Sequence, residues 1–318
     1  MLFALQILLT ARDDLDPMYS LFAGVAVSSQ NQETEPPKGE TIAMLLAYDG
    51  QPYCGWQRQS EGVSVQSVVE SALSIPCRVP ISIIGASRTD AGVHAWGQVA
   101  HAHIPHGIDP ARLFKSLNGL LPDPVRCRAL VRVPERFHSQ LWAKGKLYTY
   151  RIQCGPVRDP LRRTMTAHWP YAYDLERMRA FSQRFIGTHD FAAFANSNTE
   201  GQAGRDSVRT VWSMEIQQVE DELRIHVEGN GFLYKMVRNL VGALLELGQG
   251  RLTEEQLLTG WQSCDRALLP PPAPAEGLCL MRIDYAEGLG GGGVWSSAPD
   301  LAGGLHPPDH PIGKLERS

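Results

Sequence analysis

The chain has 318 residues, of which 43% are apolar and 20% charged, with a formal net charge of −4. That composition supports a sizeable core, in one large domain or in two closely joined ones. No apolar run approaches the roughly 20 residues of a membrane helix. The six cysteines form no CxxC pair, which excludes a zinc ribbon and a CxxC redox motif. The negative total does not exclude a nucleic-acid ligand, because phosphate binding needs only a local basic surface.

The two ends of the chain differ in composition from its middle. Residues 1–40 begin with a short apolar stretch and end in a polar, proline-containing one, so we expect a disordered leader and linker. Residues 287–318 are rich in glycine and proline and predict a flexible tail. The N-terminal stretch does not have the pattern of a signal or transit peptide. We therefore expect a cytoplasmic protein, with an organelle or the nucleus as the alternative if its source is eukaryotic.

Between these ends, strand and helix patterns alternate twice. In the first half, apolar and alternating runs predict strands at 42–48, 81–86, 98–104, 126–133 and 147–152, with helices near 65–73 and 112–120. In the second half, helices are predicted at 175–185, 233–244 and 254–264, and strands at 208–217, 222–228 and 278–285. This order predicts an α+β fold of two antiparallel sheets with helices packed on one side.

The segment Ser87-Arg88-Thr89-Asp90-Ala91-Gly92-Val93-His94 places a carboxylate directly after a predicted strand. Gly92 permits a tight turn, so Asp90 is expected on a loop at a sheet edge. Arg88 is close enough to interact with Asp90 if the loop curls, and a neighbouring cation keeps an aspartate ionised and nucleophilic. The same residues are also compatible with an ordinary Asx-turn and a surface salt bridge.

Three other features have both a structural and a functional interpretation. Tyr148 fits a core aromatic, and Arg238 lies beside the apolar stripe of its helix, where surface arginines are common. His101 and His103 share one strand face, but no cysteine or carboxylate lies nearby at a zinc-binding spacing. We therefore expect no metal, and we expect these histidines on a solvent-facing surface.

The segment SRTDAGVHAWGQVAH resembles the catalytic motif of the TruA family of tRNA pseudouridine synthases. Further segments are similar to landmarks of that family and occur in the family's order: Tyr48-Asp49-Gly50, Tyr53, Gly55-Trp56-Gln57-Arg58-Gln59, Val65-Gln66, Leu117-Asn118, Leu121-Pro122-Asp123, Phe137-His138, Gly187-Thr188-His189-Asp190-Phe191, Arg209-Thr210-Val211, Met236-Val237-Arg238-Asn239 and Glu276-Gly277-Leu278-Cys279-Leu280.

The resemblance implies a role for each matching residue. It implies that Asp90 attacks the target nucleotide, on the base or on the sugar, so that the base detaches, rotates and rejoins through carbon. It implies that Tyr148 stacks on the base and helps to remove a proton, and that Arg238 pairs with Asp90. Arg88 would prise out the nucleotide and fill its place, and Leu278 would line the pocket.

The resemblance also implies a fold, a substrate and an assembly. It implies two ferredoxin-like, RRM-like α/β subdomains with antiparallel sheets around a basic cleft, which we expect at residues 41–145, carrying the SRTDAG segment, and 146–286. The implied substrate is tRNA, at uridines 38 to 40 of the anticodon stem-loop, and the implied assembly is a homodimer. The isomerisation involves no redox change, so no cofactor and no metal are expected.

Basic and aromatic residues alternate after residue 135, a pattern that suits phosphate contact and stacking. The candidates for substrate binding are Lys144 and Lys146, with Arg58 from the earlier loop, and the stretch also contains Arg136, Trp142, Tyr148, Tyr150, Arg151, Arg158, Arg162 and Arg163. A solvated charged surface is the alternative for each of them.

The same stretch departs from the family pattern. Where the family has Ala-Arg and then Ser-Ala, this chain has Ser139-Gln140 and Trp142-Ala143. The substitution to Gln140 removes a charge that would meet phosphate. The choice of substrate is thus less certain from sequence than the chemistry.

Three alternatives to this function remain. The chain could be a relative that modifies other tRNA or mRNA uridines, or an RNA-binding relative without catalysis. It could also be a hydrolase with an aspartate nucleophile. The retention of Asp90, Tyr148 and Arg238 argues against a loss of catalysis, and the absence of a second paired carboxylate argues against the hydrolase.

Overall fold

The computed structural model of the chain describes residues 39–196 and 206–285. The expected disorder of the leader, up to residue 38, and the expected flexible tail at 287–318 lie outside the described residues. Gly39 and Glu40, which we placed in the linker, already form the start of the first strand.

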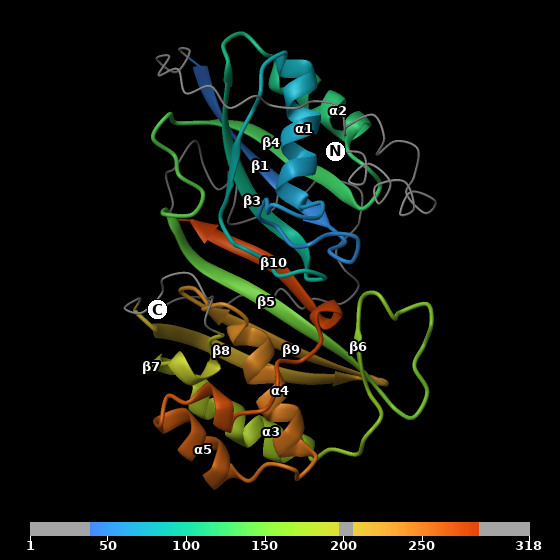
Figure 1. The fold of residues 1–318 in the computed structure, drawn as a ribbon, viewed down its shortest axis with the longest axis vertical. Coiled ribbons are helices and arrows are strands. Elements are labelled where there is room, and N and C mark those ends of the chain that lie inside the picture. The colour runs from blue at the N-terminus through green and yellow to red at the C-terminus, as the bar shows by residue number, and fades with distance from the viewer. Residues whose placement is uncertain (1–38, 197–205, 286–318) are drawn as a thin grey trace, which may run out of the picture.

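Strands and helices alternate in both halves of the chain (Figure 1). The elements of the first half are β1 (Gly39–Tyr48), α1 (Val65–Cys77), β2 (Ile83–Gly85), β3 (His94–Pro105), α2 (Pro110–Leu120) and β4 (Val125–Val133). The second half contains β5 (Ala143–Cys154), β6 (Ala167–Trp169), α3 (Leu175–Ser182), β7 (Gly187–Asp190), β8 (Val208–Val219), β9 (Glu222–Gly229), α4 (Met236–Gly248), α5 (Glu254–Gln262) and β10 (Leu278–Tyr285). Short 3-10 turns lie at Gln183–Phe185, Ala192–Phe194, Arg266–Leu268 and Ala275–Gly277.

The strands form one sheet in the order β4-β1-β3-β10-β5-β9-β8-β7, with β2 paired to β3 and β6 paired to β5. The α+β class is therefore confirmed, but the two predicted antiparallel sheets are joined edge to edge. The joining strand is β10, which pairs antiparallel with β5 and, through Cys279 and Leu280, parallel with β3. β10, the last strand among the described residues, thus lies between the halves, as Figure 1 shows.

Local sequence explains where most helices begin. Ser64 and Thr253 each form a capping box at the start of α1 and α5, which satisfies backbone N–H groups that have no partner within the helix. α4 differs from its prediction, because it begins at Met236 and not at Leu233. Lys235 precedes it in the left-handed conformation, with a φ of 60°, so the chain turns before the helix begins.

Apolar residues of the strands face the helices of each half. On β5, Tyr150 and Ile152 are fully buried, and Leu147 and Thr149 of the opposite face are buried as well, so this strand is covered on both faces. The partners of Tyr150 and Ile152 on β9, Ile225 and Leu223, are also buried. Figure 1 shows α1 and α2 on the first half of the sheet and α3, α4 and α5 on the second.

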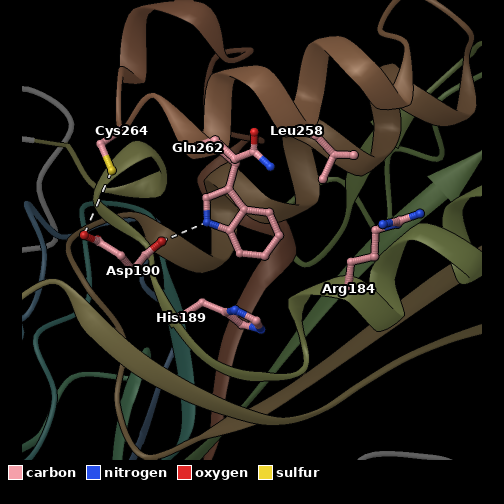
Figure 2. Close-up of a pocket in the computed structure, with 7 residues that line it drawn as sticks. Arg184, His189, Asp190, Leu258, Gln262 and Cys264 are labelled. Atoms are coloured by element: carbon pink, nitrogen blue, oxygen red, sulfur yellow. Dashed lines mark hydrogen bonds between the residues drawn. The ribbon is translucent and has the colours of Figure 1, made fainter.

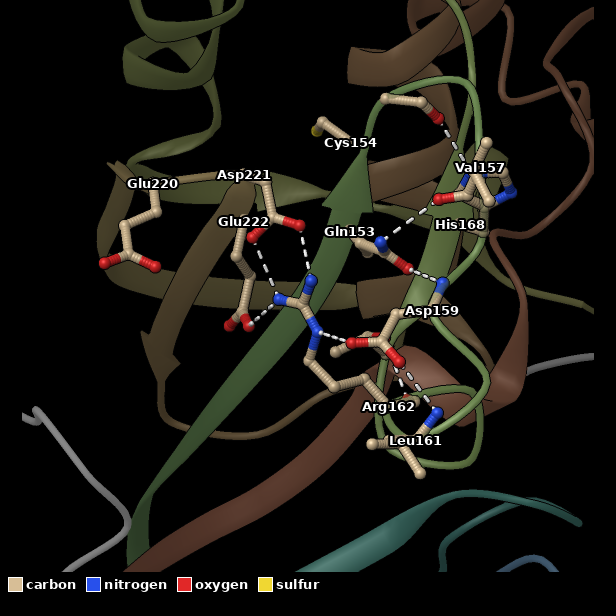
Figure 3. Close-up of polar contacts among 12 residues, drawn as sticks. Gln153, Cys154, Val157, Asp159, Leu161, Arg162, His168, Glu220, Asp221 and Glu222 are labelled. Atoms are coloured by element: carbon tan, nitrogen blue, oxygen red, sulfur yellow. Dashed lines mark hydrogen bonds and ion pairs between the residues drawn. The ribbon is translucent and has the colours of Figure 1, made fainter.

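The long connection between β5 and β6, residues 155–166, is held to the turn between β8 and β9 by one arginine (Figure 3). The guanidinium of Arg162 donates to Asp159 through Nε at 2.9 Å and to Asp221 through Nη1 at 2.9 Å. A further hydrogen bond holds this connection to β5, because the side chain of Gln153 accepts from the backbone N–H of Asp159 at 2.7 Å. In the part of the chain that the structure describes, no helix has the length and apolar character needed to cross a membrane.

Candidate active site

Asp90 lies on the loop between β2 and β3, and the first half of the chain holds this loop from two sides. The backbone N–H of Trp56 donates to the carbonyl oxygen of Thr89 at 3.0 Å. Gly55, with a φ of +115°, packs so closely that a Cβ there would lie 2.9 Å from the same oxygen. Any other residue at position 55 would be strained by the positive φ, and its Cβ would press on the Thr89 carbonyl and displace the loop.

Two buried side chains fix the loop from the sheet. The Tyr48 hydroxyl lies 2.8 Å from the Thr89 hydroxyl. The Gln98 amide donates to the Ser87 carbonyl at 2.6 Å and accepts from the Ser87 N–H at 3.2 Å. We did not single out Gln98 from sequence, although a glutamine inside a predicted buried strand is a signal, since buried amides need hydrogen-bond partners.

Arg238, in the first turn of α4, reaches the Asp90 loop from the second half of the chain. Its Nη1 donates to Oδ2 of Asp90 at 3.0 Å, and the side chains are 12% and 15% exposed. Its Nε donates to the carbonyl oxygen of Ala273 at 2.7 Å, while the Ala273 N–H donates back to the Arg238 carbonyl at 2.9 Å. The guanidinium is therefore held in one orientation, with Nη1 directed at the Asp90 carboxylate.

Tyr148 lies on β5 beside the same loop and is 6% exposed. Its hydroxyl is 2.9 Å from the Ser87 hydroxyl, and its ring meets Phe232 edge to face, with centroids 5.4 Å apart. Burial raises the pKa of Tyr148 to about 12, with the charge of Asp90 acting in the same direction and the Ser87 hydrogen bond opposing it. Phe232, in the loop before α4, was not singled out from sequence.

The other candidate residues lie in different settings. Arg88 is exposed at the loop surface, and the cation that contacts Asp90 is Arg238. Leu278 is buried at the start of β10, opposite Tyr150 of β5. Lys144 is exposed on β5. The structure therefore brings Asp90, Tyr148 and Arg238 to one loop, with Arg88 on its outer side.

Arg58 and Lys146 both have partners within the protein. Arg58 is 63% exposed and donates to the buried carboxylate of Glu70 at 3.2 Å. The Lys146 ammonium donates to the carbonyl oxygen of Ala86 at 3.0 Å and to the Ser87 hydroxyl at 3.2 Å. Lys146 thus contacts the backbone just before Asp90.

Several arginines of the predicted basic stretch are paired with carboxylates. Arg151 binds Glu222 through two nitrogens, at 2.7 and 2.8 Å. Arg162 is held by Asp159 and Asp221, as described above. Carboxylate pairing lowers the charge that these residues, and Arg58 through Glu70, offer to phosphate, whereas Arg88 and Lys144 are exposed.

The departures from the family pattern after Phe137 fall into two kinds. Ser139 is fully buried, and its hydroxyl donates to the Ile84 carbonyl at 2.7 Å. Trp142 packs edge to face on Phe137 at 5.7 Å. These positions hold the segment against the sheet, whereas Gln140 is exposed. Gln140 is therefore exposed to a ligand, and Trp142 is partly exposed.

The expectation that the histidines of β3 lie on a solvent-facing surface is wrong for His101. His101 is 3% exposed, and its Nδ1 is 2.9 Å from the Ser139 hydroxyl. Burial, with the nearby His138 and His103, lowers the pKa of His101 to about 4. The segment after Phe137 covers this strand, which periodicity alone did not show. Among the described residues, no three His, Cys, Asp or Glu side chains are grouped to hold a metal ion.

A hollow of about 480 Å³ lies elsewhere, in the second half of the molecule (Figure 2). Its lining residues are Arg184, His189, Asp190, Leu258, Trp261, Gln262 and Cys264. The Trp261 indole N–H donates to the Asp190 carbonyl at 2.8 Å. None of the residues around Asp90 lines this hollow, so it is separate from the candidate site.

Comparisons with known proteins identify the family of this chain. The family model for tRNA pseudouridine synthase matches residues 44–140 and 181–286. The tRNA pseudouridine synthase A of Syntrophotalea carbinolica is 42% identical over 77% of this chain and 96% of that protein. The tRNA pseudouridine synthase A 1 of Protochlamydia amoebophila is 41% identical, over 76% and 95%.

Among solved structures, a Cbf5-Nop10-Gar1 complex is similar with a TM-score of 0.34 and 10% identity, over 75% of this chain and 48% of that one, which is too low to support an argument. The family model, in contrast, covers more than half of the chain, and the two curated relatives match about three quarters of it. The protein therefore belongs to the TruA family of tRNA pseudouridine synthases and is an isomerase.

Proposed function

We propose that this protein isomerises uridine to pseudouridine in tRNA, at positions 38 to 40 of the anticodon stem-loop, with Asp90 as its catalytic carboxylate. The observation that carries the proposal is the 3.0 Å ion pair between Asp90 and Arg238, partly buried beside Tyr148. An ordinary surface turn would leave Asp90 in solvent. Here a separate helix supplies a cation that is itself fixed by a backbone carbonyl.

The reaction rearranges bonds within one nucleotide. The bond from C1′ to N1 breaks, a bond from C1′ to C5 forms, and the proton lost from C5 is balanced by one gained at N1. Asp90 attacks the nucleotide and holds it while the base rotates, and Arg238 keeps that carboxylate oriented. Tyr148 and Phe232 meet at right angles and offer a ring for the base to stack on.

The target base must leave its stack to reach Asp90, at a cost of a few kcal/mol. The exposed Arg88 is two residues from Asp90, and we infer that it enters the space that the nucleotide leaves. Arg58 and Lys144 are the proposed phosphate contacts, and Leu278 is the proposed apolar lining of the pocket.

We further propose that residues 41–145 form a subdomain that carries the catalytic loop and that residues 146–286 form a second one that supplies Tyr148 and Arg238. We also propose that the enzyme acts as a homodimer.

The test is a pseudouridine map of tRNA from cells that lack the protein. We expect the modification at positions 38 to 40 to disappear, to return with the wild-type gene and not to return with Asp90→Ala. An unchanged map in the deletion strain would refute the tRNA assignment. Loss at other uridines would favour a relative with a different target, and full rescue by Asp90→Ala would leave only RNA binding.

Binding of tRNA supplies an independent check. Asp90→Asn keeps the size of the side chain, so the variant should bind tRNA and form no pseudouridine. Because phosphate contacts release counterions, the affinity should fall steeply with added salt. Substitution of Lys144 by glutamine should make that salt dependence shallower by about one unit in the logarithmic slope. An affinity that does not change with salt would contradict the proposed phosphate contacts.

A further inference from the structure

A short chain of hydrogen bonds links Lys146 to Tyr148 through Ser87. The Lys146 ammonium lies 3.2 Å from the Ser87 hydroxyl, and that hydroxyl lies 2.9 Å from the Tyr148 phenol. Lys146 and Tyr148 are two residues apart on β5, so their side chains share one face of the strand. Ser87 lies three residues before Asp90 on the loop that both side chains contact.

The position of Lys146 is not that of a surface lysine. Its ammonium donates to the Ala86 carbonyl at 3.0 Å as well as to Ser87, and the side chain is only partly exposed. Within residues 39–196 and 206–285, the hydrogen-bond partners of its ammonium are the Ala86 carbonyl and the Ser87 hydroxyl, neither of which is a carboxylate. Placing a cation there without a carboxylate has a desolvation cost. A purely structural contact to a carbonyl and a hydroxyl does not require that charge.

The direction of the hydrogen bonds suggests what the charge does. An ammonium can only donate, so the Ser87 oxygen accepts from Lys146. The Ser87 hydrogen then remains available for the Tyr148 oxygen. The Ser87 hydroxyl can therefore donate to the Tyr148 oxygen, and such a donor stabilises a phenol that has lost its proton.

We propose that Lys146 and Ser87 are positioning residues for Tyr148: the ammonium orients the Ser87 hydroxyl, and this hydroxyl stabilises the deprotonated phenol that removes the proton from C5. The inference rests on the proposed function. No proton passes along the chain, because Lys146 and Ser87 keep theirs and act by hydrogen bonding. The proton taken from C5 converts the phenolate of Tyr148 to the phenol, and the proton gained at N1 completes the isomerisation.

Burial and the neighbouring charged and titratable groups shift the pKa values of Lys146 and Tyr148. Burial and then the charge of Arg209 lower the pKa of Lys146 to about 8. Burial raises the pKa of Tyr148 to about 12, Ser87 opposes this, and Asp90 and Cys279 add to it. The rate should therefore rise with pH as more phenolate forms. The rise should flatten above about pH 8, where Lys146 loses its proton.

The experiment measures pseudouridine formation in a single turnover at saturating tRNA, together with tRNA affinity. Lys146→Gln and Ser87→Ala should each lower the rate roughly tenfold, as expected for the loss of one charged hydrogen bond, with affinity unchanged. Lys146→Arg keeps a donor and a charge and should recover most of the rate. Lys115→Gln, which removes an exposed lysine on α2, is the matched control and should match the wild type.

The pH profile separates a positioning role from a structural one. Between pH 6 and 9, the single-turnover rate of the wild type should rise and then level off above about pH 8. The rate of Lys146→Gln should be lower and should rise continuously, so that the two pH–rate curves converge. A variant that is only less stable would show a lower melting temperature and a profile of unchanged shape, which would overturn the proposal.

The phenol itself provides the second control. In a Tyr148→Phe background, Lys146→Gln should cause no further loss, because the group it acts on is gone. Independent losses in the double variant would refute the link. Reduced affinity with an unchanged saturated rate would make Lys146 a phosphate contact instead. If the wild type forms no pseudouridine in tRNA, the proposed function itself fails, which is a different outcome from any of these.

Discussion

Nη1 of Arg238 lies 3.0 Å from Oδ2 of Asp90, although 148 positions separate the two residues in the chain. The arginine comes from the first turn of α4 and the aspartate from the loop before β3. This contact joins the two halves of the molecule at the site itself. The central position of β10, between β3 and β5, is what brings the halves close enough for it.

Arg238→Lys should lower the saturated rate about 10- to 100-fold. Arg238 uses separate nitrogens for Asp90 and for the Ala273 carbonyl, and a lysine cannot keep both contacts in the same geometry. Single-turnover kinetics would measure the loss. Arg179→Lys is the control, because Arg179 on α3 also binds a carbonyl and a carboxylate, those of Ile216 and Glu176. Equal rates in Arg238→Lys and the wild type would contradict the role of the guanidinium.

Tyr148→Phe should reduce the saturated rate by about 100-fold or more while tRNA affinity changes little. The substitution removes the group proposed for proton transfer and retains the ring for stacking. Tyr285→Phe is the matched control, since its partly buried hydroxyl donates to the Ser139 carbonyl at 2.6 Å, outside the site. If Tyr148→Phe instead weakened binding at full rate, the tyrosine would serve the substrate and not the chemistry.

Gly55→Ala should impair catalysis more than its effect on stability explains. The new Cβ would lie 2.9 Å from the Thr89 carbonyl, and the φ of +115° disfavours any other residue, so the Asp90 loop must shift. Gly107→Ala supplies the comparison, because its φ is also positive, at +82°, but nothing lies within 4 Å of the added atom. Both should lose about 1 kcal/mol or more in urea unfolding. Only Gly55→Ala should lose most of its activity.

Glu222→Gln should lower the free energy of unfolding by about 3 kcal/mol at neutral pH, because it leaves two arginines without their buried carboxylate. Glu222 is 3% exposed and contacts both Arg151 and Arg224. Asp123→Asn removes a carboxylate that is 99% exposed and should change little. Urea unfolding would measure both variants.

The pH dependence of that loss has a definite sign. Burial alone would raise the pKa of Glu222, but the hydrogen bonds from Arg151 and Arg224 bring it below its usual value. A depressed pKa stabilises the folded state above the unfolded pKa of about 4.3, and the contribution disappears as the pH falls through the folded pKa. The difference between wild type and Glu222→Gln should therefore shrink between about pH 5 and pH 3. A difference that is constant with pH would contradict the assignment.

The elements could be predicted from sequence because their patterns are local. Alternation along β5 and the spacing of the apolar residues of α4 come from the geometry of a strand and of a helix. The start of α4 could not be predicted, since Lys235 adopts a left-handed φ that the apolar spacing does not reveal. His101 was placed wrongly because the segment that covers it, around Ser139, is distant in the chain.

The sequence by itself determined the family, the α+β class and the residues that its motifs name, among them Asp90, Tyr148 and Arg238, because motif order and local periodicity are properties of the chain. Tertiary structure alone decided which groups touch. It joined the sheets through β10, gave Asp90 its partner in Arg238, and turned Lys146 inward to Ser87. The physical reason is that an ion pair or a buried hydrogen bond depends on distances of about 3 Å between residues far apart in sequence, which only the packed chain defines.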